Sequence, residues 1–140
     1  MATLFTRIIE GEIPGTFVWR DPECVGFLSI NPVQPGHTLV VPVAEVDHWI
    51  DLEPDLASHV TAVAQTIARA QQHVYSPLKV GLLIAGLEVP HVHLHVIPIR
   101  HGEADLHLDR ATTATPEQLE VEAAKLRGAL GDAGADGVSG

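Results

Sequence analysis

The chain has 140 residues, 46% of them hydrophobic, which fits one globular domain with its own core. Its 18 acidic residues outnumber the 8 lysines and arginines, and the formal net charge of −10 excludes a general nucleic-acid-binding surface, which is basic. The single cysteine, Cys24, cannot form an internal disulfide, which excludes a disulfide-stapled secreted scaffold.

Residues 1–12 carry charged side chains and lack the apolar stretch of a signal peptide. The longest apolar run, residues 80–87, is far shorter than the ~20 residues that a membrane-spanning helix needs. We therefore expect a cytoplasmic protein that has neither a membrane nor a nucleic-acid polymer as its partner.

The first half of the chain alternates short helical and β-rich patterns. Apolar spacing predicts a short helix over Leu4–Glu10 and then a hairpin of two strands, Thr16–Arg20 and Cys24–Ile30. A proline-rich loop over residues 31–36 follows. The next segment, His37–Pro42, has the composition of a buried strand and ends at its proline.

The second half contains the two longest predicted helices. Apolar residues at helical spacing predict an amphipathic helix over residues 54–74, and two β-rich runs follow at Lys79–Ala85 and His91–Ile99. Thr115, with Pro116 next and Gln118 three residues on, is a helix-start signature.

The inventory is about five strands, two main helices and a short leading helix, which favours an α+β class over alternating βαβ units. Four of the last ten residues, 131–140, are glycine, and their only apolar side chains are alanine and valine. We expect this segment to be a mobile tail, with residues 1–130 forming a single domain.

Histidine is the unusual feature of the composition, since nine are present and three of them alternate as His91, His93 and His95. Side chains alternate across a strand, so these imidazoles should share one face and line one wall of a cleft. The intervening residues, Val92 and Leu94, should then point into the core.

Three interpretations of the triplet are open. It can be an ordinary sheet face of solvated or hydrogen-bonded histidines. It can be a zinc site, in which Glu103, Asp105 or His107 adds a further ligand. It can also act on phosphorus, because a neutral imidazole whose second nitrogen donates a hydrogen bond is a good nucleophile, and flanking imidazoles can bind phosphate oxygens.

Three segments carry a resemblance to a known family. The run His-Val-His-Leu-His-Val-Ile at residues 91–97 resembles the signature of the histidine triad (HIT) family of nucleotide hydrolases and transferases. Residues 29–42 are similar to the loop and strand that carry the family's fourth histidine, here His37. Residues 4–14 resemble its N-terminal helix and turn.

The resemblance implies a five-stranded antiparallel sheet that pairs across a homodimer into a ten-stranded sheet. It implies that His93 attacks the α-phosphate of a nucleoside phosphoramidate, acyl nucleotide or dinucleoside polyphosphate and forms a covalent nucleotidyl-histidine. His95 would contact the phosphate and the leaving group, while His91 and His37 would support them by hydrogen bonds. No metal is obligatory, and zinc at the histidine cluster would be adventitious.

The resemblance also implies a base pocket, formed by five apolar residues: Leu4, Phe5, Ile8, Phe27 and Ile30. Two positions depart from the family's pattern. Ser29 stands where an acidic residue usually receives the ribose hydroxyls. The link before the triplet is only residues 86–90, where Gly86 and Glu88 fall at the phosphate subsite and a carboxylate would repel a phosphate.

Two alternatives remain open, and the departures at Ser29 and Glu88 favour the first of them. The protein can be a catalytically weak regulatory module that binds nucleotide or zinc, or a metal-dependent hydrolase that uses the triplet as ligands. The segment after Arg100 matches no motif.

Overall fold

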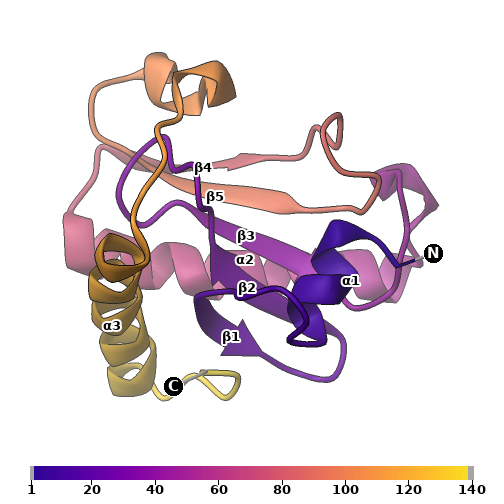
Figure 1. The fold of residues 1–140 in the computed structure, drawn as a ribbon. Coiled ribbons are helices and arrows are strands. Elements are labelled where there is room, and N and C mark those ends of the chain that lie inside the picture. Colours follow the sequence, from indigo (N-terminus) through magenta and orange to yellow (C-terminus); the bar gives the residue numbers. More distant parts are fainter. Residues whose placement is uncertain (1, 139–140) are drawn as a thin grey trace.

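The computed structural model describes residues 2–138 (Figure 1). Its regular elements follow one another as α1 (Leu4–Ile9), β1 (Phe17–Arg20), β2 (Cys24–Leu28), β3 (Thr38–Pro42), α2 (Pro54–Tyr75), β4 (Lys79–Leu83), β5 (Leu94–Ile99) and α3 (Pro116–Asp132), with short 3-10 turns at 49–51, 103–106 and 108–110. The five strands form one antiparallel sheet in the order β1-β2-β3-β5-β4. The expected α+β class is confirmed.

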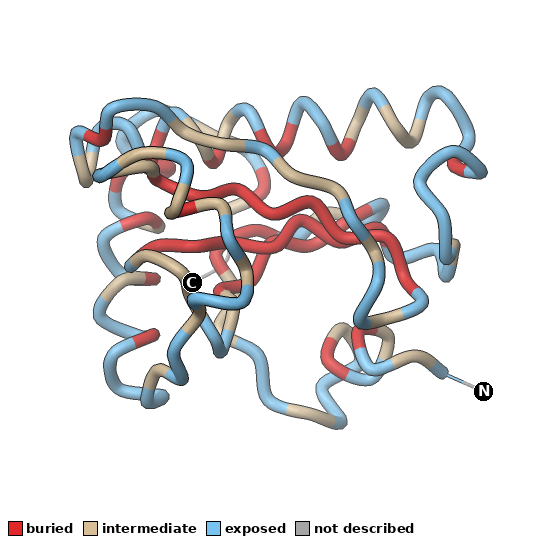
Figure 2. The backbone as a smooth tube through the Cα atoms, turned by 90° about the horizontal axis from the view of Figure 1, so that it is seen from above, coloured by how far each residue is buried: buried red, intermediate tan, exposed pale blue. Residues whose placement is uncertain are grey.

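Helices cover both faces of the sheet, with α2 along one face and the short α1 on the other (Figures 1 and 2). The larger core cluster lies between the sheet, α2 and α3, and it includes Val92, Leu94 and Val96. The smaller cluster lies under α1 and contains Phe5, Ile8, Val25, Phe27, Leu39 and Val41. The side chains of β2 and β3 therefore divide between two cores, which explains why both strands are buried throughout.

The predicted helices begin where the sequence signals place them. Thr115 caps α3 with a complete capping box, in which its hydroxyl accepts from the Gln118 backbone N–H and the Gln118 side chain accepts from the Thr115 backbone N–H. The long helix α2 begins at Pro54 and ends at Tyr75, and its C-cap residue Ser76 adopts a left-handed conformation. Among residues 2–138, none of the helices is long and apolar enough to cross a bilayer.

The expectation that the last β-strand begins at His91 is wrong, because pairing with β3 starts only at Leu94, opposite Val40. Two residues beyond Val40, Pro42 has no backbone N–H to donate. Its carbonyl oxygen instead lies 2.7 Å from Nε2 of His91. The triplet therefore straddles the end of the strand, and only its third histidine lies within it.

The predicted tail, residues 131–140, is also corrected in part. Helix α3 continues to Asp132, and the chain then returns to the sheet edge, where the Arg20 N–H donates to the Gly137 oxygen at 2.7 Å and Val138 forms a bridge with Trp19. Gly137 lies so close to the Trp19 ring that a Cβ atom would come within 2.2 Å of it. Backbone contact thus holds residues up to 138, although the segment offers few apolar side chains; residues 139 and 140 lie outside the described part of the chain.

Gly36 fixes the loop that leads into His37. Its φ of 92° lies in the left-handed region, and a Cβ atom there would lie 2.4 Å from the Tyr75 ring of α2. The Gly36 carbonyl accepts from Nε2 of Gln71, which also donates to the Val96 carbonyl. Helix α2 therefore sets the position of His37 through Gln71 and Tyr75.

We expect Gly36→Ala to destabilise the protein by about 2–4 kcal/mol, because the side chain adds both backbone strain and a clash. Urea unfolding measures the change. Gly128→Ala is the matched control, since Gly128 lies in α3 with open space around it, and there the substitution should stabilise by roughly 0.5–1 kcal/mol. Equal stability of Gly36→Ala and the parent protein would contradict this account.

Candidate active site

The ring of His93 is held in one orientation by the backbone. Its Nδ1 lies 2.8 Å from the carbonyl oxygen of His91. A carbonyl oxygen only accepts, so Nδ1 carries the proton and Nε2 of the neutral ring keeps a free electron pair. The ring packs edge-on against Phe5 and His95, at 4.9 Å and 5.0 Å between centroids.

A second chain of hydrogen bonds orients His95. The Val33 N–H donates to Nδ1 of His37 at 3.1 Å, so in neutral His37 the proton is on Nε2. Nε2 of His37 lies 2.9 Å from Nδ1 of His95 and therefore donates to it. This leaves the proton of neutral His95 on Nε2, the nitrogen that is free to donate to a ligand.

Burial keeps both imidazoles of this pair neutral. It lowers the pKa of His37 to about 3, with further lowering by His95 and His93. It also lowers the pKa of His95 to about 4, with a smaller contribution from His93. The proton positions assigned to His37 and His95, whose hydrogen bonds with Val33 form the histidine relay, therefore hold at neutral pH.

His91 does not line the cleft wall that the sequence predicted for all three histidines. It is fully buried, with its Nε2 donating to the Pro42 carbonyl and its Nδ1 accepting from the Thr3 hydroxyl at 2.6 Å. Burial lowers the pKa of His91, which keeps this ring neutral too. His91 thus ties the start of α1 to the end of β3, and its carbonyl orients His93.

A cavity of about 590 Å³ opens in front of His93, His95 and His37. All five residues of the predicted base pocket line it: Leu4, Phe5, Ile8, Phe27 and Ile30. Phe5, Ile8 and Phe27 are buried and form its floor, whereas Leu4 and Ile30 are exposed at its rim. An apolar cavity with a few convergent polar groups is the usual form of a small-molecule site.

The three residues predicted at the ribose and phosphate subsites do not all line this cavity. Ser29 and Glu88 line the cavity, but Gly86 does not and instead lines a separate depression with His48 and Trp49. The Ser29 hydroxyl oxygen accepts from the Asn31 N–H, so its own proton remains free to be donated.

The segment after Arg100, which had no recognisable motif, completes the cavity with Leu108, Ala111, Ala114 and Leu119. Backbone bonds hold it beside the loop that follows β2: Ala114 N–H donates to the Ile30 oxygen and Thr112 N–H to the Pro32 oxygen. These contacts are hydrogen bonds between main-chain atoms, which do not require particular side chains. The sequence therefore carried no signal for them.

Asp105, considered above as a metal ligand, is buried in a hydrogen-bond network instead. Its carboxylate accepts from the backbone N–H groups of Arg100 and His101, at 2.7 Å and 2.9 Å, and from the Gln34 side chain. Burial alone raises the pKa of Asp105, but these bonds outweigh it and lower the pKa. Neither Asp105 nor Glu103 nor His107 lines the cavity.

Within residues 2–138, only Asp21, Cys24 and His59 form a group of three or more metal-ligand types whose atoms lie within 4.8 Å. Asp21 Oδ2 already accepts from Trp19 Nε1 and lies 2.8 Å from His59 Nε2. Burial raises the pKa of the Cys24 thiol, and Asp21 raises it further. These residues could hold zinc only by exchanging hydrogen bonds for metal bonds, and they do not line the cavity. The histidine triplet does not converge on such a site.

The fold and the histidine relay define an α+β domain built around a buried imidazole cluster. The HIT domain family matches residues 10–102, and the chain belongs to this family.

Relatives and solved structures agree. The chain is 35% identical over 107 residues to an uncharacterized HIT-like protein of Methanocaldococcus jannaschii, covering 74% of this chain and 83% of the relative. It is 31% identical over 106 residues to the adenosine 5'-monophosphoramidase of Saccharomyces cerevisiae, covering 75% and 67%. The crystal structure of a zinc-bound histidine triad family protein from Mycobacterium smegmatis matches with a TM-score of 0.81 and 29% identity, over 96% of both chains.

Proposed function

We propose that this protein hydrolyses or transfers the nucleotidyl group of a nucleoside phosphoramidate, an acyl nucleotide or a dinucleoside polyphosphate. The observation that carries the proposal is the 2.8 Å contact between His93 Nδ1 and the His91 carbonyl, which leaves Nε2 unprotonated beside an apolar cavity. The phosphoramidase named above, 31% identical to this chain, supports the substrate class.

In the first step, Nε2 of His93 attacks the α-phosphorus. A phosphorus–nitrogen bond forms, and the bond to the leaving group breaks as the leaving group takes the electron pair and a proton from solvent water. In the second step, water attacks the same phosphorus, gives up a proton to the solvent, and releases the nucleoside monophosphate and free His93. Nε2–H of His95 donates to a phosphate oxygen in both steps, where charge builds up.

The proposed chemistry requires no metal, because an imidazole supplies the nucleophile. A test is to incubate the protein with adenosine 5'-phosphoramidate, with and without a chelator, and to quench in acid and in base. We expect AMP release that is insensitive to the chelator and a protein-bound nucleotide that survives base but not acid, as a phosphorus–nitrogen bond does. Turnover that disappears with the chelator would instead support a metal-dependent hydrolase.

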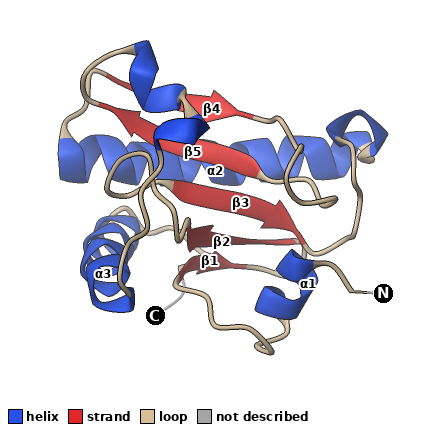
Figure 3. Ribbon diagram, turned by 45° about the horizontal axis from the view of Figure 1, so that its top comes forward, coloured by secondary structure: helices blue, strands red, loops and turns tan. Residues whose placement is uncertain are grey.

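We also propose that two chains pair through β4, which is an unpaired edge of the sheet (Figure 3). Beside this edge, small and polar residues of α2 line a shallow trough with Gly81 and Leu82. An exposed edge strand with an apolar flank needs covering, and a two-fold pairing of β4 with its copy would join two sheets into one of ten strands.

Light scattering should therefore give twice the 15.0 kDa mass of one chain. Leu82→Lys should shift the protein towards monomer, because a charge would be buried at the interface. Val121→Lys, at an equally exposed position on α3, should leave the mass unchanged. A parent protein that remains a monomer at high concentration would contradict the pairing.

A further inference from the structure

The charge of the cavity is unusual for a site that would bind phosphate groups. Of the described residues that line it, Glu88 is the only one with a formal charge, and no lysine or arginine takes part. The α-phosphate can be bound by the imidazoles, but any further phosphates would find no cation and would share the cavity with a carboxylate. Phosphate sites usually supply lysine or arginine for that purpose.

Glu88 stands on a loop whose backbone is well anchored. The carbonyl of the next residue, Val89, accepts from the His91 N–H at 2.7 Å, and the Val89 side chain packs against the smaller core cluster. On the other side, Gly86 has a φ of 74°, which turns the chain. The hydrogen bond of Val89 and the turn at Gly86 hold residue 88 close to the triplet in space.

The carboxylate itself has no partner within residues 2–138, where no hydrogen bond or ion pair of Glu88 occurs, unlike the paired Glu12, Glu120 and Glu122. The Glu88 side chain is exposed to solvent. Its charge is therefore available to whatever occupies the cavity.

We propose that Glu88 is a specificity-determining residue that selects nucleotide substrates with a neutral or positively charged leaving group and disfavours polyphosphates. This inference rests on the function proposed above. An attached amine or amide would meet a compatible carboxylate, whereas each added phosphate would be repelled on binding. Glu88 need not touch the reacting atoms to exert this effect.

The effect should be moderate and sensitive to salt. At the mouth of a cavity, partly in water, a unit charge should change kcat/KM by about three- to ten-fold per unit of leaving-group charge. Exposed charges are screened over a Debye length of roughly 8 Å at physiological ionic strength, so the preference should shrink in about 0.5 M salt.

Three matched substrates test the inference, each joining AMP through its phosphorus to the nitrogen of an amine of similar length. The amines are 1,4-diaminobutane, 4-aminobutanamide and 4-aminobutanoate, so the leaving groups differ in charge but hardly in size. We expect kcat/KM to fall in that order for the parent protein, measured with EDTA present. Glu88→Gln should flatten the order, and Glu88→Lys should reverse it.

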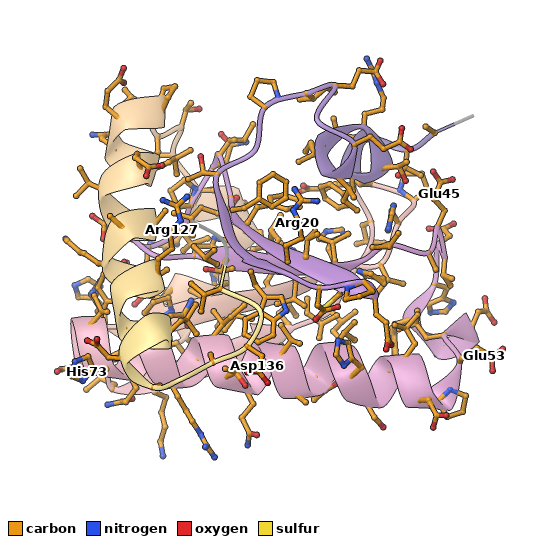
Figure 4. The ribbon with its side chains drawn as sticks, turned by 90° about the horizontal axis from the view of Figure 1, so that it is seen from below. Arg20, Glu45, Glu53, His73, Arg127 and Asp136 are labelled. Atoms are coloured by element: carbon orange, nitrogen blue, oxygen red, sulfur yellow. The ribbon has the colours of Figure 1, made fainter. Side chains whose placement is uncertain are left out.

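The control is Glu53→Gln, the same chemical change at an exposed residue that makes no side-chain capping bond and lies at the start of α2 (Figure 4). It should leave the order unchanged. If Glu88→Gln alters all three rates equally, the carboxylate acts on the shared nucleotide half, and the inference is wrong although the proposed function stands. If the parent protein cleaves none of the three and forms no bound nucleotide, the proposed function itself fails.

Discussion

His93→Gln should lower kcat/KM for adenosine 5'-phosphoramidate by at least about 10⁴-fold, the scale typical of losing a nucleophile. Glutamine has no ring nitrogen to attack phosphorus, and no other imidazole of the cluster offers a comparable one. Nε2 of His95 carries a proton, and His37 and His91 use both ring nitrogens in hydrogen bonds. Steady-state AMP release and acid or base quenching of labelled enzyme measure the loss.

His73→Gln is the matched control, because His73 is exposed near the end of α2 that lies opposite Glu53 (Figure 4). This variant should keep full activity. Circular dichroism should show that both variants are folded. A His93→Gln protein that still becomes labelled would assign the nucleophile to another residue.

The free energy of unfolding should fall steeply as the pH drops below about 6.5, the pKa of an unperturbed histidine. Burial lowers the pKa of His37 to about 3 and of His95 to about 4 in the folded protein. At a pH between these lowered pKa values and about 6.5, the unfolded chain binds more protons than the folded one. Stability that is fully present above about pH 6.5 is therefore lost on acidification, with a slope of about 1.4 kcal/mol per pH unit for each such histidine.

Urea unfolding between pH 5 and 8 measures this slope. The carboxylates with lowered pKa values, Asp21, Asp105 and Glu45, lose their contribution only below about pH 5, so they do not obscure the window. His37→Gln should reduce the slope by one histidine's share, whereas His73→Gln should not. A parent protein whose stability is constant from pH 8 to pH 5 would show that burial does not lower the pKa values of His37 and His95.

Much of the candidate site was predictable because its signals are local. Alternation along residues 91–96 placed Val92 and Leu94 in the core, and His93 and His95 on the cavity side, as the structure has them. The apolar residues of α1 were predicted as pocket on the strength of the resemblance, and Leu4, Phe5 and Ile8 do line the cavity. Spacing and motif carry such information because neighbouring residues in a strand or helix have fixed directions.

The errors arose where contacts join distant parts of the chain. His91 was expected to line the cleft, but the bonds from its ring to Thr3 and Pro42 bury it. Gly86 was expected at the phosphate subsite and faces another depression. The tail was expected to be mobile, yet Gly137 packs on Trp19, which lies 118 positions earlier in the chain. No local pattern encodes these partners.

The sequence by itself determined the α+β class and the order of the elements, and it singled out His37, His91, His93 and His95 as candidate site residues. It could do so because periodicity, capping residues and spaced motifs are properties of neighbouring residues. Only the tertiary structure decided which nitrogen of each imidazole holds its proton, since that depends on the carbonyl of His91, the N–H of Val33 and the hydroxyl of Thr3. It also decided that this acidic chain forms a cavity whose described lining residues include a single carboxylate, that of Glu88. The net charge of −10 therefore does not describe the cavity, where Glu88 carries the one formal charge among the described lining residues.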